Sequence, residues 1–390
     1  MRRRAFLGLL IAVVNGGAAG PEALEGLLEP IRRRHELPAL AAAVVRDGRL
    51  AALGAVGVRK AGSTVAVTRD DALHIGSCTK AMTATLIALL VDEGKLRWET
   101  TLAEGLPALA AGMHAGYRKA TLEHLLSHRA GVAANVPPGV PFGRLWTLPG
   151  EPPEQRRAYA KLLLAVPPRS KPGSKYLYSN AGYAIAAAIA ERAAGASWRE
   201  LMRRRIFDPL GMKTAGFGSM GTPGKIDQPW QHVLRGGKRQ AIGPRPQSDN
   251  PPAIGPGGRV HCSIGDWAKF VAAHLGGPRG RTCPIRLKRA TWRRLHTPPQ
   301  GGSYALGWSV TQRAWGGGTV LTHAGSNTMN FAVVWMAPKR DVAVLVATNL
   351  GGPPAPKACD DAAAALVRKF APEAGASGPP DKHVGARRPL

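Results

Sequence analysis

Strand-forming segments lie near both ends of this chain, whereas helix-forming segments fill the middle. The first two candidate strands are residues 39–45 and 50–58, and Asp47-Gly48 between them is typical of a hairpin turn. The later candidate strands are residues 305–311, 320–323, 331–337 and 342–348. Because a sheet can join segments that are distant in sequence, this order predicts one antiparallel sheet built from both ends of the chain.

Apolar residues recur at helical spacing in the middle of the chain and at its two ends. The predicted helices are residues 21–36, 81–93, 121–127, 155–165, 180–194, 198–207, 266–275 and 358–370. Turn residues dominate residues 217–256, which are predicted to form a loop. The expected fold class is α/β in the α+β sense: helices flank the antiparallel sheet, and a mainly helical domain is inserted into it. A functional site would then lie where the two parts meet.

The N-terminus has the pattern of an export signal. Arg2–Arg4 form a basic start, Leu7–Val14 are apolar, and residues 17–19 are small, so the segment is too short to span a membrane. Its Arg3-Arg4 pair resembles a twin-arginine signal, with an ordinary Sec signal as the alternative. We therefore expect a signal peptide over residues 1–19, one folded domain over 20–370 and a disordered tail over 371–390. The expected location is periplasmic or secreted, without a membrane anchor.

The charge of the chain is strongly positive, with 53 Lys and Arg against 25 Asp and Glu and a net charge of +28. Such a charge favours polyanions, so anionic cell-wall polymers are candidate partners. The basic residues are scattered, and a solvated basic surface without a polymer partner is the alternative. No zinc-finger, RNA-binding or basic heptad pattern is present, so nucleic acid is not an expected partner.

Cysteine and histidine spacing indicates no metal site. The cysteines form no Cys-x-x-Cys pair, and whether Cys262 and Cys283 form a disulfide in an exported protein stays open. His124 and His128 lie one helical turn apart without an evident third ligand, which favours a packing role. His-Glu-x-x-His, Gly-x-Ser-x-Gly and P-loop patterns are absent from the sequence.

Among the serines of the chain, only Ser77 is followed three residues later by lysine, at Lys80. The pair lies where a helix is predicted to begin, and residues three apart share one face of a helix. The helix N-terminus favours negative charge on the serine, and a lysine whose pKa is lowered by burial can take the serine's proton. The pattern therefore indicates a nucleophile and its base, although a capping serine followed by a surface lysine would look the same.

Two further motifs add groups that can act with Ser77. Only Tyr178 among the tyrosines is followed two residues later by asparagine, and a phenol near a lysine can exchange protons. Asn180 can donate to a substrate carbonyl and hold the lysine. The third motif, residues 323–326, ends an apolar strand: His323 would line the pocket, and Gly325 would let a substrate lie close to the strand edge. The backbone amides of Ser77 and Ser326 can then form an oxyanion hole.

In order and spacing, the three motifs resemble the serine β-lactamase and penicillin-binding-protein superfamily, and Tyr-x-Asn resembles its class C branch. Segments similar to that family extend the resemblance to about residues 22–370: they are residues 76–96, 121–128, 172–195, 208–212, 257–258 and 304–308. The resemblance implies a β-lactamase/transpeptidase-like fold and an acyl-enzyme on the nucleophile, without a metal or another cofactor. The roles it implies are catalytic for Ser77, Lys80 and Tyr178, and substrate-binding for Asn180, His323, Gly325 and Ser326.

This chain departs from class C β-lactamases on the third motif, where they carry Lys-Thr-Gly and it has His-Ala-Gly. A fixed ammonium that would bind a β-lactam carboxylate is replaced by His323, which is mostly neutral at about pH 7. Ala324 removes a hydroxyl, and Asn330 stands where many relatives have glycine and would reshape the pocket. His-x-Gly is common among the peptidase, esterase and D-amino-acid amidase members of the family. We also expect activity to change with pH near the pKa of His323.

The sequence therefore predicts a secreted serine hydrolase that acts on small ester, amide or D-amino-acid peptide substrates, with β-lactams as further candidates. One alternative is a slow-turnover penicillin-binding or sensor protein whose acyl-enzyme is not effectively hydrolysed. A second alternative is a basic protein whose main role is to bind cell-wall polymers.

Overall fold

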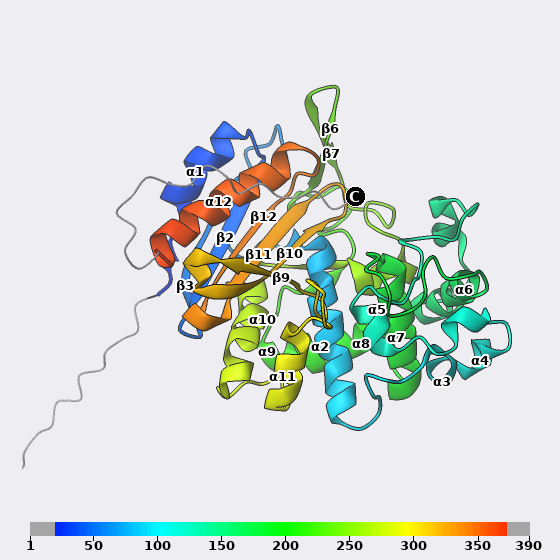
Figure 1. Ribbon diagram of the computed structural model, residues 1–390. Coiled ribbons are helices and arrows are strands. Elements are labelled where there is room, and N and C mark those ends of the chain that lie inside the picture. The colour runs from blue at the N-terminus through cyan, green and yellow to red at the C-terminus, as the bar shows by residue number, and fades with distance from the viewer. Residues whose placement is uncertain (1–19, 373–390) are drawn as a thin grey trace, which may run out of the picture.

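The computed structural model describes residues 20–372, so the expected export signal at residues 1–19 and residues 373–390 of the expected tail lie outside the described part. A seven-stranded sheet forms the centre of the molecule (Figure 1). Its strands, in spatial order, are β1 (Glu22–Ala23), β3 (Arg49–Gly57), β2 (Ala39–Arg46), β12 (Val342–Thr348), β11 (Phe331–Ala337), β10 (Gly318–Ser326) and β9 (Ser309–Arg313). Strand β12 pairs with β2 in antiparallel register, which confirms that the two ends of the chain build one sheet.

The structure corrects several predicted elements. The helix expected over residues 21–36 begins later, because Glu22–Ala23 pairs with β3 as the one parallel strand of this sheet, and helix α1 spans Glu25–Arg34. The strand expected over residues 305–311 is β9, which starts at Ser309. The predicted loop over residues 217–256 contains a hairpin, β6 (Gln231–Arg235) and β7 (Lys238–Ile242), which projects from the molecule in Figure 1.

Both faces of the central sheet are buried. Along β2, Ala39, Ala41, Ala43 and Val45 face one core, whereas the residues between them face the other. This period of two is the side-chain alternation of a strand, and here both sets are apolar. Helices α1 and α12 (Pro354–Phe370) cover one face (Figure 1). Helices α2 (Thr79–Asp92), α10 (Ile264–Gly276) and α11 (Arg289–His296) lie on the other side.

The inserted part is mainly helical, as expected. Its helices are α3 (Leu102–Gly105), α4 (Pro107–Ala110), α5 (Leu122–Leu126), α6 (Pro152–Leu164), α7 (Asn180–Ala194), α8 (Trp198–Met202) and α9 (Asp208–Leu210). A small sheet of β4 (Leu73–His74), β8 (Val260–Cys262) and β5 (Gly216–Phe217) lies beside the start of α2, and only β4 precedes α2 in the chain. The short 3₁₀ and π turns are η1 (Gly76–Cys78), η2 (Ala115–Tyr117), η3 (Phe142–Thr147), η4 (Arg203–Phe207), η5 (Pro252–Gly257), η6 (Gly277–Arg279), η7 (Ala314–Gly316) and η8 (Pro338–Arg340).

Helix α2 lies in the interior between the sheet and the helical part. Every residue from Thr79 to Leu90 is buried, which is typical of a helix with neighbours on all sides. Each of its fully buried leucines contributes roughly 1.5–3 kcal/mol through apolar burial. The residues at its N-terminus are therefore held firmly by packing along the whole helix.

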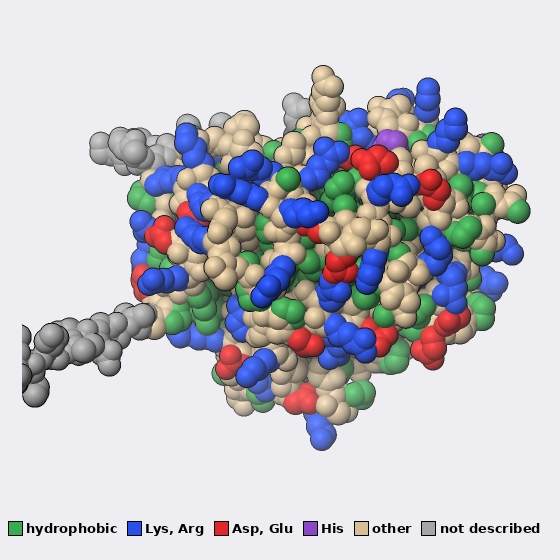
Figure 2. All heavy atoms as spheres, turned by 90° about the horizontal axis from the view of Figure 1, so that it is seen from below, with side chains coloured by type: hydrophobic (Ala, Val, Ile, Leu, Met, Phe, Trp, Pro, Cys, Tyr) green, Lys and Arg blue, Asp and Glu red, His purple; other side chains and the backbone are tan. Residues whose placement is uncertain are grey.

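Basic side chains are numerous on the face of the molecule drawn in Figure 2, without one dominant patch there. Figure 2 shows Lys and Arg side chains spread over the face drawn, with fewer acidic side chains between them. Among residues 20–372, no helix is both long enough and apolar enough to cross a lipid bilayer. The four cysteines are free thiols, so Cys262 and Cys283 are not joined.

A buried ion pair joins the helices of the inserted part. The Arg156 side chain of α6 is 1% exposed and pairs with Glu191 of α7, whose side chain is 6% exposed. Arg156 Nη1 also donates to Pro252 O at 3.2 Å, and the Glu191 carboxylate accepts from Trp198 N at 2.7 Å. Removing one member of such a pair leaves the other buried and unpaired.

We therefore expect Glu191→Ala to lower the free energy of unfolding by about 3–5 kcal/mol, because the Arg156 guanidinium loses its partner. Urea denaturation followed by circular dichroism measures this change. The control is Glu154→Ala, which removes an ion pair with Arg157 in which both side chains are about half exposed and which should leave the midpoint unchanged. Equal midpoints for the two variants would contradict the proposed importance of the buried pair.

Candidate active site

Ser77 lies in the turn η1, between the small sheet and the buried helix α2, and its side chain is partly exposed. The preceding Gly76 has φ +51, and a Cβ atom there would lie 2.3 Å from Ser326 N. Glycine is required because any side chain would push away the end of β10. The fold thus presents Ser77 at the start of a rigid helix, beside the end of a sheet strand.

Lys80, one turn along α2, is completely buried and points at Ser77. Its Nζ lies 3.0 Å from Ser77 Oγ, 2.7 Å from Asn180 Oδ1 and 2.6 Å from Gly257 O. Burial lowers the pKa of Lys80 well below its usual value, which favours the neutral amine. A neutral amine has two N–H donors, which the two carbonyl oxygens accept. Its lone pair then faces the Ser77 hydroxyl.

Tyr178 approaches Ser77 from the other side, and its hydroxyl donates to Ser77 Oγ at 2.8 Å. Burial raises the pKa of Tyr178, so the phenol stays protonated. Lys80 Nζ lies 4.7 Å from the centre of the Tyr178 ring. The two side chains are thus close enough to exchange a proton through the serine between them.

Asn180 is the first residue of α7 and completes the set around Lys80. Its Oδ1 accepts from Lys80, and its Nδ2 donates to Asn135 Oδ1 at 2.9 Å, which fixes the orientation of the amide. One N–H of this amide stays available for a substrate carbonyl. The sequence-based expectation that this residue holds the lysine agrees with this geometry.

The end of β10 packs directly against the Ser77 turn. A Cβ atom on Gly325 would lie 2.0 Å from Ile75 O and 2.6 Å from Ser77 N. Gly325 is therefore required by the approach of the chain's own turn, whereas the sequence analysis explained it by the approach of a substrate. Ser326 is exposed, and its backbone lies against Gly76. The structure thus brings the Ser77 and Ser326 backbones together, as an oxyanion hole requires.

His323 is buried, with 6% of its surface exposed, and both ring nitrogens have partners. Nδ1 lies 2.6 Å from Ala324 O and Nε2 lies 2.9 Å from the Tyr304 hydroxyl. A carbonyl only accepts, so Nδ1 carries the proton and Nε2 accepts from Tyr304. Burial, with a contribution from Lys80, lowers the pKa of His323 to about 3. The pH step expected from this residue therefore lies far below neutral pH.

Asn330 does not shape the pocket as the sequence analysis expected. It is fully buried, and its Nδ2 donates to Gln231 Oε1 at 2.5 Å and to Asn327 Oδ1 at 3.0 Å. The side chain therefore belongs to the packing beneath the β10–β11 turn.

Sequence reasoning missed several residues that support the site. They are Asn135, which orients Asn180, Gly257, which accepts from Lys80, and Tyr304, which contacts His323. Gly257 and Tyr304 lie in segments whose sequence resembles the family, so the sequence did point to these two residues. His128 has the packing role that was preferred, with Nδ1 accepting from Ser179 N at 3.1 Å. No sequence pattern indicated Asn135.

Within residues 20–372, the structure contains no group of three or more His, Cys, Asp or Glu side chains that could hold a metal ion. The groups around Ser77 are instead those of nucleophilic catalysis: a hydroxyl between an amine of lowered pKa and a protonated phenol.

Comparisons with known proteins agree with this geometry. A family model described as Beta-lactamase matches residues 24–369. Penicillin-binding protein 4 of Amycolatopsis lactamdurans is 30% identical over 351 residues, which cover 83% of this chain and 84% of that protein. The D-alanyl-D-alanine-carboxypeptidase/endopeptidase AmpH of Escherichia coli K12 is 26% identical over 324 residues, which cover 76% of this chain and 79% of AmpH. The octameric penicillin-binding protein homologue from Pyrococcus abyssi has the same fold, with a TM-score of 0.71 at 22% identity over 90% of this chain and 77% of that chain.

The family model spans nearly the whole described domain, and the similarity to penicillin-binding protein 4 extends over most of both chains. The superfamily and fold expected from the sequence motifs are both confirmed. This chain belongs to the beta-lactamase family and is a serine hydrolase.

Proposed function

We propose that this hydrolase transfers acyl groups to Ser77 from small esters, amides or peptides, and releases them to water. The observation that carries the proposal is the position of Ser77 Oγ, 3.0 Å from the Lys80 amine and 2.8 Å from the Tyr178 hydroxyl. Both distances are within hydrogen-bond reach, the first requirement for a base and an acid that act on one nucleophile. The lowered pKa of Lys80 and the raised pKa of Tyr178 suit these two roles.

Acylation follows from this arrangement. Ser77 Oγ attacks the substrate's carbonyl carbon while its proton passes to the neutral Lys80 amine, and the carbonyl oxygen becomes negative. The backbone amides of Ser77 and Ser326 stabilise this oxyanion. Tyr178 then gives its proton to the leaving alcohol or amine as the carbon–heteroatom bond breaks, and Lys80 returns a proton to Tyr178. The products are the acyl-enzyme and the protonated leaving group.

Deacylation reverses these roles with water in place of the leaving group. A water oxygen attacks the acyl carbon while its proton passes to the Lys80–Tyr178 pair. The bond to Ser77 Oγ then breaks, and Oγ regains a proton from the same pair. The cycle ends with the free acid and the original protonation of the site.

The substrate class follows from the side chains around Ser77. His323 is neutral and engaged with Tyr304, so it offers no fixed positive charge for a substrate carboxylate. Tyr176, which is 48% exposed, packs beside the buried Tyr304, with the centres of the two rings 5.7 Å apart. The exposed Tyr176 ring suits an apolar acyl or side-chain group of the substrate. Neutral esters and amides are therefore better substrates than penicillins.

One relative supports the second candidate function, slow turnover of a penicillin. The similar protein from Amycolatopsis lactamdurans is named a penicillin-binding protein, so a stable penicilloyl-enzyme is the alternative outcome for this chain. AmpH, which is named a carboxypeptidase and endopeptidase, supports peptides as substrates. The N-terminal pattern of residues 1–19 supports export to the periplasm or medium, where anionic cell-wall polymers would meet the basic surface.

Ser77→Ala should lower ester turnover by about 10³-fold or more, because the attacking oxygen is lost. Hydrolysis of p-nitrophenyl acetate and the mass of the fluorophosphonate adduct measure this loss. The control is Ser63→Ala, whose hydroxyl contacts only Lys60 O and which should keep full activity. Unchanged turnover and labelling in Ser77→Ala would show that another residue is the nucleophile.

The ratio of kcat/KM for p-nitrophenyl acetate to that for nitrocefin should exceed about tenfold, since a charged hydrogen bond to the β-lactam carboxylate is missing. Ala324→Thr restores one hydroxyl on the exposed side of β10 and should speed nitrocefin acylation several-fold without changing ester turnover. Stopped-flow absorbance measures both the acylation by nitrocefin and the turnover of the ester. Comparable turnover of the two substrates by the wild-type protein would contradict the proposed preference.

The pH dependence of kcat/KM should follow Lys80, not His323. Acylation needs the neutral amine, so activity rises with pH as Lys80 loses its proton, at a pH well below the usual lysine value. His323, with its pKa lowered to about 3, is neutral throughout the range from about pH 5 to pH 8. His323→Gln should therefore leave the shape of the profile unchanged in that range. A step that is present in the wild-type protein and absent from His323→Gln would disprove this assignment.

A further inference from the structure

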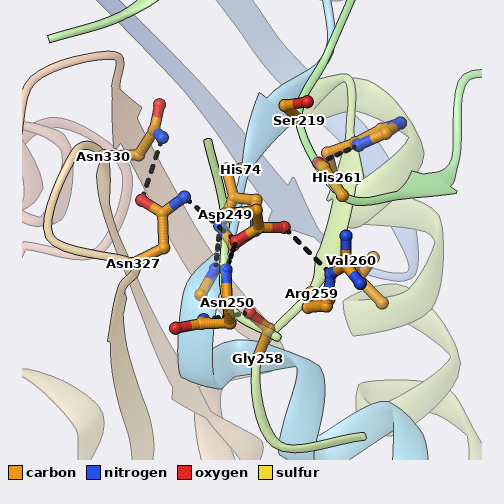
Figure 3. Close-up of polar contacts among 12 residues, drawn as sticks. His74, Ser219, Asp249, Asn250, Gly258, Arg259, Val260, His261, Asn327 and Asn330 are labelled. Atoms are coloured by element: carbon orange, nitrogen blue, oxygen red, sulfur yellow. Dashed lines mark hydrogen bonds and ion pairs between the residues drawn. The ribbon is translucent and has the colours of Figure 1, made fainter. Parts of the chain in front are cut away.

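Directly behind the Ser77 turn lies a buried polar network centred on Asp249. The Asp249 carboxylate is completely buried, and it joins three segments that are far apart in the sequence. Figure 3 shows it between His74, Asn327 and Arg259, with Asn250 beside it. None of these side chains belongs to the three motifs that identify the family, and the catalytic steps above do not use them.

Asp249 accepts from four donors, and one of them, His74 Nε2, lies 3.0 Å from both carboxylate oxygens. Oδ1 accepts from Asn250 N at 2.7 Å and from Asn327 Nδ2 at 3.2 Å. Oδ2 accepts from His74 Nε2 at 3.0 Å and from Arg259 Nε at 3.3 Å. Burial opposes ionisation, but His74 and Arg259 outweigh it and keep the pKa of Asp249 below its usual value. Every partner is a donor, so only a carboxylate satisfies the whole set.

The first connection runs through His74 to the nucleophile turn. Gly76 N donates to His74 Nδ1 at 3.1 Å, so Nδ1 is unprotonated and Nε2 carries the proton that it donates to Asp249. Asp249 favours this tautomer because its carboxylate accepts the proton of Nε2 on the other side of the ring. The carboxylate thus determines, through His74, the position of the peptide unit that precedes Ser77.

The second connection runs to the end of β10. Asn327 follows Ser326 directly, and its Oδ1 accepts from Met329 N at 3.2 Å, so the side chain closes the turn after the strand. Its Nδ2 donates to Asp249 and to Gln231 Oε1. The carboxylate therefore holds the segments that carry both proposed oxyanion donors, the amides of Ser77 and Ser326.

A third connection reaches the support of Lys80. Asn250, whose backbone N–H donates to Asp249, donates from Nδ2 to Gly258 O at 2.9 Å. The adjacent Gly257 O is the acceptor of Lys80 Nζ at 2.6 Å. The same short segment therefore contacts the three backbone stretches that surround the reacting serine.

We propose that Asp249 is a positioning residue for acyl transfer, which holds the Gly76–Ser77 and Ser326–Asn327 segments at the separation that an oxyanion requires. This inference rests on the proposed acyl transfer at Ser77. A buried charge that served stability alone could be replaced by apolar packing at little loss. Here three of the four donors, His74, Asn327 and Arg259, come from segments next to the reacting groups. Two amides displaced by about 1 Å would lose a large part of their stabilisation.

The first test is Asp249→Asn, which keeps the size of the side chain but points an NH₂ group at two of the four donors. The matched control is Asp266→Asn. Asp266 is also a buried carboxylate, and it accepts from Thr214 N at 2.8 Å and from Lys269 Nζ at 2.6 Å. Neither of these donors contacts Ser77. Each variant is assayed for its unfolding midpoint, and for kcat and KM with an aryl ester and its thiono analogue. Sulfur is a poorer hydrogen-bond acceptor, so the oxo-to-thiono rate ratio reports on the oxyanion hole.

We expect Asp249→Asn to lose about 100-fold in kcat for the oxo ester, with KM changed less than about twofold and the oxo-to-thiono ratio collapsed. Asp266→Asn should keep the wild-type oxo-to-thiono ratio, even if its unfolding midpoint falls as far as that of Asp249→Asn. A folded Asp249→Asn that keeps the wild-type kcat, or that loses rate with an unchanged ratio, would overturn the proposal.

If Asp249→Asn does not fold, the variants His74→Gln and His74→Phe test the same proposal. The amide of glutamine offers one acceptor for Gly76 N and one donor for Asp249, whereas phenylalanine offers neither. Glutamine should keep most of the oxo-to-thiono ratio and phenylalanine should lose it, and equal ratios in both would overturn the proposal. Failure of the proposed function looks different: the wild-type protein itself would show no turnover or labelling that depends on Ser77, and the positioning role would fall with it.

Discussion

The site depends on the burial of one amine. Lys80 is enclosed by α2, by the first residue of α7 and by the Gly257 turn, and the hydrogen-bond partners of its Nζ there are oxygen atoms. Removal from water makes the ammonium costly and leaves a neutral amine whose lone pair faces a hydroxyl. The same enclosure keeps the Tyr178 phenol protonated. One physical condition, the exclusion of water, thus separates the roles of base and acid around Ser77.

Close backbone contact is the second condition, and glycine supplies it. Gly76 and Gly325 face each other's segments at distances that leave no room for a Cβ atom. The sheet strand β10 and the helix α2 can therefore meet at the reacting serine, although one comes from the C-terminal and the other from the N-terminal part of the chain. The buried carboxylate of Asp249 lies behind this contact and joins its two sides.

Local pattern was a good guide where an element is long and its apolar residues are periodic. Strands β2 and β12 and helix α7 were predicted close to their observed bounds. The hairpin β6–β7 was missed, although Gly236 and Gly237 both have positive φ, as the two central residues of a type I′ turn do. Its strands are polar and lie in a segment rich in proline and glycine, so the strand pattern could not be recognised in the sequence. Strand β1 was wrongly included in a predicted helix, because a strand of two residues is too short to show the alternation of side chains.

The sequence by itself determined the family, the fold class and which residues gather at the site, because the Ser-x-x-Lys, Tyr-x-Asn and His-x-Gly motifs are local patterns with recognisable spacing. The tertiary structure decided what those residues can do. From the sequence, His323 was expected to titrate in the pocket. In the structure, both of its ring nitrogens form hydrogen bonds, with Tyr304 and with Ala324 O, and burial keeps the ring neutral. Asn135 and Asp249 had no signal at all, since their partners lie tens to hundreds of residues away. Protonation and orientation depend on such distant neighbours, and only the folded chain brings them together.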